Sequence, residues 1–264
     1  MRRIQFIELH DQPWFPSSMR DETTEALQFG FNLLKSYAPI APLLQSAIDS
    51  TCSVSIVDMC SGGGGPWLDL CRKLRGRNPG GYLSSLQIWL TDKYPNLKAF
   101  QNARLASENQ ITFHPGSVDA TKVPRELKGL RTMFTSFHHF APDDARAVLQ
   151  DAVDAGESVA IFEVPRRGWS TISLTFAFVF MLFVCTPWIR PFRWSRLFWT
   201  YLVPIIPWVL LFDGVVSCLR TYRPWELREL VERLTANQYQ WEIGEHGSGK
   251  APITYLIGYP RAST

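Results

Sequence analysis

The chain has 264 residues, of which 46% are hydrophobic and 19% charged, and its formal net charge is +3. This length suits one large α/β domain, or one domain with an insertion, and argues against an array of domains. The weak positive charge, without a run of lysine or arginine, argues against nucleic-acid binding, so we expect no nucleic-acid partner.

Cysteine usage and the first residues bear on the cellular setting. The five cysteines are odd in number and lack the spacing of a zinc site. We therefore expect reduced thiols, with no disulfide framework and no metal centre. The first ten residues carry charges too early for the apolar core of a signal peptide, so export is not expected.

Residues 1–50 are predicted to form an N-terminal helical cap segment. A helix is expected over about 22–36, and Pro39 and Pro42 would end it. The stretch Trp14-Phe15-Pro16 fits two interpretations, a lid over a crevice or an anchor in the core.

From residue 53 onward, short apolar runs alternate with helical patterns. Strands are expected at 54–59, 86–91, 111–114, 130–137 and 159–164, and helices at 66–75, 96–108 and 143–155. Parallel strands need crossover connections, which helices of this length supply. The pattern therefore predicts an α/β fold with a doubly wound, mostly parallel sheet.

The pattern resumes after an interruption of about 55 residues. An amphipathic helix is expected over 224–234, followed by strands at 239–245 and 253–259 with a hairpin-length connection between them. The sheet would then have seven strands and end in an antiparallel pair. The main domain would consist of residues 51–165 and 221–264.

A run of four glycines, Gly62 to Gly65, directly follows the apolar strand that ends in Asp58. Glycines permit positive φ and let a ligand approach the backbone closely. In open α/β sheets the ligand site lies at such a turn between a strand and a helix N-terminus. The dinucleotide pattern GxGxxG is only loosely met and the phosphate-loop pattern is absent, so neither NAD nor ATP is well supported.

The stretch Asp58-Met59-Cys60-Ser61-Gly62-Gly63-Gly64 resembles the first motif of class I S-adenosylmethionine-dependent methyltransferases, which is an acid, an apolar residue and then GxGxG. Cys60 stands where the first glycine usually lies, as it does in some RNA-modifying members. The resemblance extends in element order over about 53–165 and 224–260. It implies a Rossmann-like fold and S-adenosyl-L-methionine as cofactor. The cofactor's amino-acid portion would lie against Cys60, Ser61, Gly62 and Gly64, and Asp58 would at least orient the turn.

Two further acids fall where the resemblance implies cofactor contacts. Asp92 is similar to the acid after the second strand that bonds both ribose hydroxyls, a role that suits the two oxygens of a carboxylate. Asp119 is similar to the acid that holds the adenine amino group. Lys93 and Tyr94 would flank the ribose, and Val118 would lie against the base.

The fourth strand runs into Thr135-Ser136-Phe137-His138-His139-Phe140, where substrate-facing residues of that family lie. Histidine suits proton removal near neutrality, so His138 or His139 is a candidate general base. The alternative is that one packs and the other bonds a backbone group. Ser136 is counted with the cofactor-binding residues. Glu163, which ends the fifth strand, is either catalytic or structural.

Residues 166–220 form the interruption and are unusually apolar. The run 168–189 has no charge, and the run 197–219 contains only Asp213. Each is long enough as a helix to cross the ~30 Å bilayer core, although Pro204 and Pro207 would kink the second. We therefore expect a hydrophobic helical hairpin in a membrane, with the catalytic domain on the cytoplasmic side.

The arginines leave the placement of this hairpin open. Those at its base fit the positive-inside rule, whereas Arg190, Arg193 and Arg196 at its tip disfavour translocation. The hairpin would then lie within one leaflet, with the arginines at phosphates and tryptophans among the headgroups. A third alternative is burial in a homo-oligomer interface.

The hairpin follows the fifth strand, at the edge of the sheet where a substrate would enter. This placement predicts a hydrophobic or membrane-partitioned acceptor, either a small molecule or a lipid. The sequence thus indicates a membrane-associated S-adenosylmethionine-dependent methyltransferase. The alternatives are a noncatalytic cofactor-binding membrane scaffold and, because of Cys60, an RNA methyltransferase.

Overall fold

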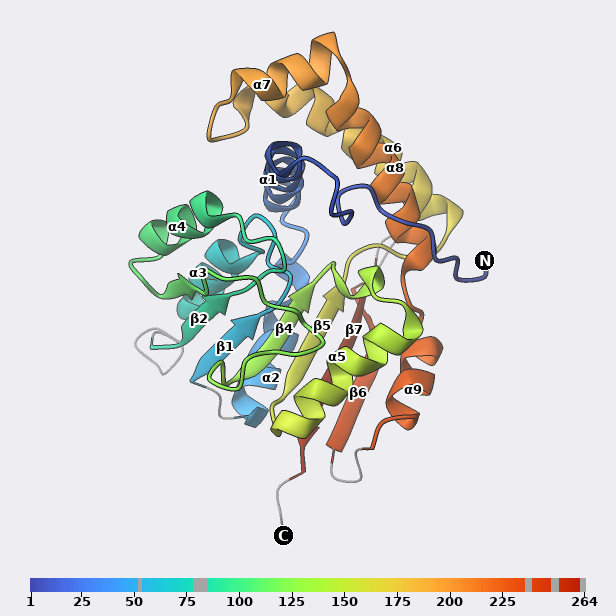
Figure 1. The fold of residues 1–264 in the computed structure, drawn as a ribbon. Helices are drawn as coiled ribbons and strands as arrows, with labels where there is room; N and C mark the ends of the chain where they lie inside the picture. The colour runs from blue at the N-terminus through green and yellow to red at the C-terminus, as the bar shows by residue number, and fades with distance from the viewer. Residues whose placement is uncertain (52–53, 78–84, 236–238, 248–251, 262–264) are drawn as a thin grey trace.

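The described strands form one seven-stranded sheet in the order β3-β2-β1-β4-β5-β7-β6 (Figure 1). The computed structural model describes residues 1–51, 54–77, 85–235, 239–247 and 252–261. The strands are β1 (Ser55–Asp58), β2 (Gln87–Leu90), β3 (Ile111–Phe113), β4 (Leu130–Phe134), β5 (Val159–Glu163), β6 (Tyr239–His246) and β7 (Ile253–Pro260). Strands β1 to β5 pair in parallel, and β7 pairs antiparallel with both β5 and β6. The predicted doubly wound α/β sheet with its terminal antiparallel pair is confirmed.

The register brings the carboxyl ends of the central strands to one edge. Asp58, the last residue of β1, lies opposite Leu90 of β2 and Thr132 of β4. Strands β4 and β5 are buried along their whole length, as expected for the centre of a parallel sheet. The loops that follow β1, β2 and β4 therefore meet above the same edge.

Helices cover both faces of the sheet. The helices α2 (Ala41–Thr51), α3 (Trp67–Arg77) and α4 (Leu97–Ala106) contribute to one core cluster. The helices α5 (Pro142–Ala155) and α9 (Pro224–Glu232) contribute to a second cluster. The alternation of inward side chains on the strands divides the core into these two layers.

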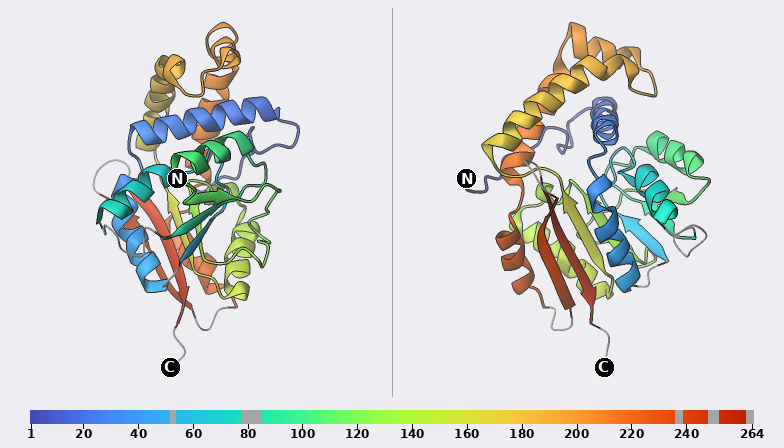
Figure 2. Two further views of the ribbon diagram at one scale, coloured as in Figure 1. Left: turned by 90° about the vertical axis from the view of Figure 1, so that its left-hand side faces the viewer. Right: turned by 180° about the vertical axis from the view of Figure 1, so that it is seen from behind.

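The apolar insertion folds as a helical hairpin beyond the carboxyl edge of the sheet. It consists of α6 (Trp169–Cys185), α7 (Trp194–Leu197), a π-helix (Phe198–Leu202) and α8 (Ile205–Arg220). Helix α1 (Ser17–Leu33) crosses the space between this hairpin and the sheet (Figures 1 and 2). A third apolar cluster joins α1, α6 and α8.

The helices differ from the predictions in three places. Helix α1 begins at Ser17 rather than near residue 22. Helix α2 was not predicted, because Pro42 reads as a break, yet it occupies the first turn, where proline is tolerated. The apolar run 197–219 is not one kinked helix, since the chain bends by 76° between Leu202 and Ile205.

Candidate functional site

A cavity of about 870 Å³ lies above the carboxyl edge of the sheet. Residues of the glycine turn and the loops after β2, β3 and β4 line one part of it. Helices α1, α6 and α8 line another part with apolar side chains, among them Leu27, Phe31, Leu174, Phe178, Met181 and Leu210. The cavity is thus continuous from a polar compartment at the sheet to an apolar compartment under the hairpin.

The glycine turn adopts the left-handed backbone conformations that its sequence indicates. Gly62, Gly64 and Gly65 have φ of 52°, 109° and 60°. Cys60 also has a positive φ, 55°, which an L-residue adopts only at a conformational cost. The position where the resemblance places a glycine is therefore one that glycine would fit best. Gly62 lines the cavity, whereas Gly64 is not among its lining residues.

Asp58 holds the turn from below. Its Oδ1 accepts a hydrogen bond from Thr132 Oγ1 (2.7 Å) and its Oδ2 one from Ser61 Oγ (2.7 Å). Burial raises the pKa of this carboxyl to about 7, although the bonds from Ser61 and Thr132 oppose the shift. Asp58 therefore joins β1, β4 and the turn, which agrees with an orienting role.

Asp92 connects the β2 loop to the glycine turn. Its Oδ2 accepts from the Gly62 N–H and its Oδ1 from the Tyr94 N–H, both at 2.8 Å. Each carboxylate oxygen can accept a second hydrogen bond, so the group can still receive two hydroxyls. Lys93 beside it is exposed and also lines the cavity.

Asp119 and Val118 lie on the β3 loop at the same cavity. Asp119 is exposed, and its Oδ1 accepts from the backbone N–H and the hydroxyl of Thr121. These bonds lower the pKa of its carboxyl. Val118 is buried, and its N–H donates to the Asp92 carbonyl. The acids at 58, 92 and 119 thus line a common cavity, as the sequence predicts.

The loop after β4 is strained and held from beneath by Glu163. Thr135 has φ of 49°, unusual for a β-branched residue and typical of strain at functional sites. Glu163 Oε1 accepts from the N–H groups of Ser136 and Phe137, and Oε2 lies 2.5 Å from His138 Nδ1. Glu163 itself is not among the residues that line the cavity. It therefore positions the loop and His138, which favours the structural interpretation of this residue.

The two histidines of this loop have different environments. With Nδ1 on Glu163, His138 is oriented so that its Nε2 points away from that carboxylate, and this atom is buried and has no hydrogen-bond partner. His139 Nδ1 lies 2.7 Å from Asp11 Oδ2. Burial acts to lower the pKa of His139, but the charges of Asp11 and Glu8 outweigh it and raise the value to about 9. A protonated imidazole cannot accept a proton, so His138 is the better candidate base.

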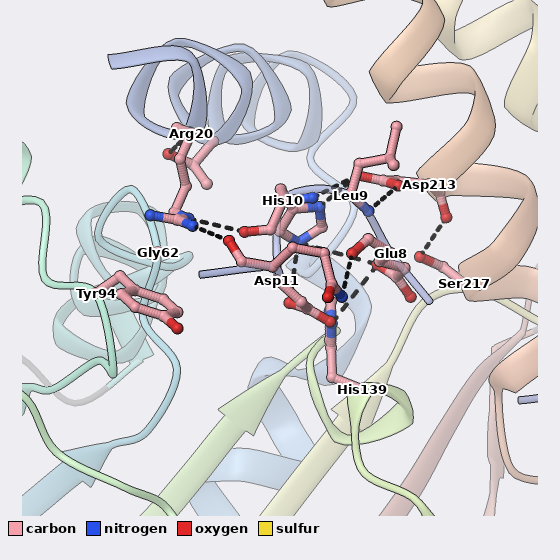
Figure 3. Close-up of polar contacts among 12 residues, drawn as sticks. Glu8, Leu9, His10, Asp11, Arg20, Gly62, Tyr94, His139, Asp213 and Ser217 are labelled. Carbon is pink, nitrogen blue, oxygen red and sulfur yellow. Dashed lines mark hydrogen bonds and ion pairs between the residues drawn. The ribbon is translucent and has the colours of Figure 1, made fainter. Parts of the chain in front are cut away.

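The N-terminal segment supplies polar groups that the sequence analysis missed. Glu8, His10 and Asp11 line the cavity beside His139 (Figure 3). Asp213 of α8 anchors the segment by accepting from the N–H groups of Leu9 and His10 at 2.7 and 3.2 Å. The charged residues near the N-terminus were the only sign in the sequence that this segment has a polar role. No spacing pattern connects them with His139, which lies far along the chain.

Arginine 20 links the N-terminal segment to the β2 loop. Its guanidinium donates to the carbonyls of His10 and Gln12, both at 2.7 Å. It also lies over the Tyr94 ring, 4.2 Å from the centroid, which is a favourable cation–π distance (Figure 3). Of the expected lid stretch, Phe15 is buried and Trp14 is exposed, so Phe15 acts as an anchor.

The tip of the hairpin docks on α1. Arg193 and Arg196 both pair with Glu25, and Ser195 bonds Glu22. Arg196 is only 1% exposed. The expectation that all three tip arginines face lipid phosphates is therefore wrong for Arg193 and Arg196, because a protein carboxylate already neutralises them.

Within the described residues one helix, Trp169–Trp188, is long and apolar enough to cross a membrane. The bent pair that follows, Trp194–Leu202 and Ile205–Arg220, would count as a second only if the two helices are taken as one span.

No protein-family model matches the chain, and a search of curated proteins finds no match. Among solved structures, the chain is similar to the plantazolicin methyltransferase BpumL in complex with SAH, with a TM-score of 0.54 and 10% identity over 93% of this chain and 96% of that one. It is also similar to the methyltransferase domain of bacterial CtHen1-CN (TM-score 0.50, 10% identity, 85% and 99% covered). A third is the mitomycin 7-O-methyltransferase MmcR (TM-score 0.50, 15% identity, 87% and 54% covered).

These similarities establish the fold. At 10–15% identity, the chain has the Rossmann-like fold of these methyltransferases. It spans between 54% and 60% of the longer neighbours. One fold of this kind hosts many reactions, so the fold alone does not specify the reaction or its substrate.

Proposed function

We propose that this protein is an S-adenosylmethionine-dependent methyltransferase that acts on an apolar small molecule. The observation that carries the proposal is the single cavity that joins the glycine turn and its three acids to an apolar compartment under α6 and α8. Neighbouring structures with the same fold, solved with SAH, support the choice of cofactor. The apolar lining supports the choice of acceptor.

The residues at the polar end fit this cofactor. Asp92 has one acceptor site left on each oxygen for the two ribose hydroxyls. Asp119 Oδ1 is occupied by Thr121, which leaves Oδ2 to accept from the adenine amino group. Gly62 has no side chain, so it adopts a positive φ without strain and lets the cofactor's amino-acid portion approach the backbone.

The chain contributes positioning and proton handling to the reaction. When bound, the cofactor supplies an electrophilic methyl group on a sulfonium. Asp58 fixes the glycine turn, and the apolar lining from the hairpin excludes water from the acceptor. His138, oriented by Glu163, accepts the acceptor's proton at Nε2. His139 does not act as this base.

We further propose that the outer face of the hairpin lies in one leaflet of a membrane, with the catalytic domain on the cytoplasmic side. Trp169, Phe180 and Trp208 are 75%, 70% and 66% exposed, an unusual density of large apolar side chains on a surface. The 76° bend and the docking of the tip on α1 favour an in-plane arrangement over a straight crossing. An acceptor that partitions into the leaflet could then reach the apolar compartment directly.

Two measurements test the activity and the location separately. A membrane lipid extract incubated with the enzyme and methyl-labelled cofactor should yield a labelled apolar product, identified by mass spectrometry. Cofactor binding without any labelled product would favour the noncatalytic scaffold, and labelled RNA would favour the RNA methyltransferase. Flotation with anionic phospholipid vesicles should carry the protein upward, and Trp169→Ser with Trp208→Ser should reduce this. Failure to float would contradict the membrane proposal alone.

A further inference from the structure

Four potential ligand atoms converge where the N-terminal segment meets the loop after β4. Glu8, His10 and His139 each present one such atom, and all of these lie within 4.8 Å of one another. Glu8 Oε2 is 3.6 Å from His139 Nδ1 and 3.9 Å from His10 Nε2. Asp11 borders the same space, with Oδ1 3.6 Å from His10 Nε2. Ligands of a tetrahedral Zn²⁺ bonded at about 2.0–2.1 Å lie about 3.4 Å apart, close to these separations.

Glu8 has an unsatisfied atom that points into this space. The side chain is 0% exposed, and Oε1 accepts from Arg220 Nη1 at 3.2 Å. Oε2 is buried without any hydrogen-bond partner. Burying a carboxylate oxygen without a hydrogen-bond partner costs free energy, so we expect a cation to bind this atom.

His10 is oriented as a metal ligand would be. Its Nδ1 lies 2.7 Å from Asp213 Oδ2, which directs Nε2 toward Glu8 and Asp11 (Figure 3). A carboxylate behind the far nitrogen of a histidine is the usual support of a metal-bound imidazole. Asp213 also fixes the backbone of Leu9 and His10, so the whole segment is held in this orientation.

We propose that Glu8, His10 and His139 bind one divalent transition-metal ion, of which Zn²⁺ is the best fit. Two imidazoles and one carboxylate form a ligand set that holds such ions and leaves a position open. Glu8 and Asp11 both face Arg220, and Asp213 lies behind His10, so three carboxylates surround the cluster. An ion of charge +2 would take the place of the proton that His139 Nδ1 shares with Asp11. The remaining coordination position, bordered by Asp11, opens onto the cavity.

The site departs from the expectation of no metal centre, because its ligands are far apart in the sequence. Its consequence for catalysis depends on the proposed function. An acceptor hydroxyl bound at the open position would lose its proton more readily, since a metal ion lowers the pKa of bound oxygen. The binding of the ion itself does not depend on methyl transfer.

Calorimetric titration of the untagged, chelator-treated full chain with Zn²⁺, without cofactor, tests the proposal. We expect one ion per chain in the wild type. Glu8→Gln and His10→Gln should each weaken binding by about 100-fold or more. Asp213→Asn leaves all three proposed ligands in place but weakens the support behind His10 and its backbone, so it should reduce the affinity by about 10- to 100-fold. The control His246→Gln, on β6 outside the cluster, should bind Zn²⁺ as the wild type does.

Two outcomes would overturn the proposal. One is a wild-type chain that binds no Zn²⁺ under these conditions, which would leave the cluster as an ion-pair network. The other is Zn²⁺ binding that Glu8→Gln, His10→Gln and Asp213→Asn all leave unchanged. Circular dichroism of each variant controls for folding, and Asp213→Asn keeps the test valid if Glu8→Gln does not fold. Cofactor affinity, measured on the same samples, shows separately whether the proposed function fails.

Discussion

Replacing Asp92 tests the cofactor site most directly. Its two oxygens each accept one backbone N–H, from Gly62 and from Tyr94, at 2.8 Å. The remaining lone pairs would accept the two ribose hydroxyls. Hydrogen bonds to a charged group contribute about 1.5–3 kcal/mol each, so losing both should cost about 3 kcal/mol or more.

We therefore expect Asp92→Ala to raise the dissociation constant for S-adenosylmethionine by about 100-fold or more. Asp92→Asn keeps one oxygen acceptor and should cost less, about 10-fold. Part of the loss in both variants comes from the glycine turn, because Gly62 N–H loses a charged acceptor.

Isothermal titration of each variant with S-adenosylmethionine and with its demethylated product measures these constants. Asp143→Ala is the matched control, since that carboxylate is 95% exposed on α5. Equal affinity of Asp92→Ala and the wild type, within about twofold, would show that this acid does not hold the ribose.

Three other predictions concern the turn and the hairpin. Because the pKa of Asp58 is raised to about 7, its contribution to stability is full below about pH 4 and is lost as pH rises through 7. In urea unfolding, the free energy of unfolding of the wild type should fall relative to that of Asp58→Asn between about pH 4 and 7, by at most about 1.4 kcal/mol per pH unit. A difference between the two proteins that stays constant over this range would contradict the prediction. Cys60→Gly should raise the unfolding free energy by up to about 1 kcal/mol by relieving its positive φ, with cofactor affinity kept, and a clear loss of stability would argue against strain there. Glu25→Gln should release the hairpin tip and speed tryptic cleavage after Arg193 and Arg196, whereas an unchanged cleavage rate would mean that these pairs do not hold it.

Local pattern explains why most of the fold was predictable. The apolar run ending at Asp58, the glycines and the helical spacing after Pro66 specify strand, turn and helix within about 20 residues. Asp92 and Asp119 could be placed at one edge because each lies in the loop after a parallel strand, β2 or β3, and parallel strands end at one edge. Element order gives the shared edge, whereas the roles of the two acids came from the resemblance to methyltransferase motifs.

The parts that could not be predicted depend on contacts between distant segments. Nothing in the sequence places Glu8 and His10 beside His139, since the N-terminal segment is positioned by Asp213 on α8. Likewise, the arginines at the hairpin tip read as a membrane signal until Glu25 of α1 is found opposite them. Charges with a tertiary partner and charges that face solvent or lipid look the same in one sequence.

The N-terminal segment, α1 and the hairpin line the cavity together, so we expect their packing to control which molecules enter its apolar compartment. Gly30 of α1 lies so close to α6 that an added Cβ would be 2.5 Å from Phe178. Gly214 of α8 is similarly close to Thr175 of α6, at 2.7 Å. Both glycines set how tightly α6 closes over the cavity, while the strands beneath keep the glycine turn in place. The same sheet edge can therefore hold an unchanged cofactor site while the inserted helices determine the size and polarity of the acceptor.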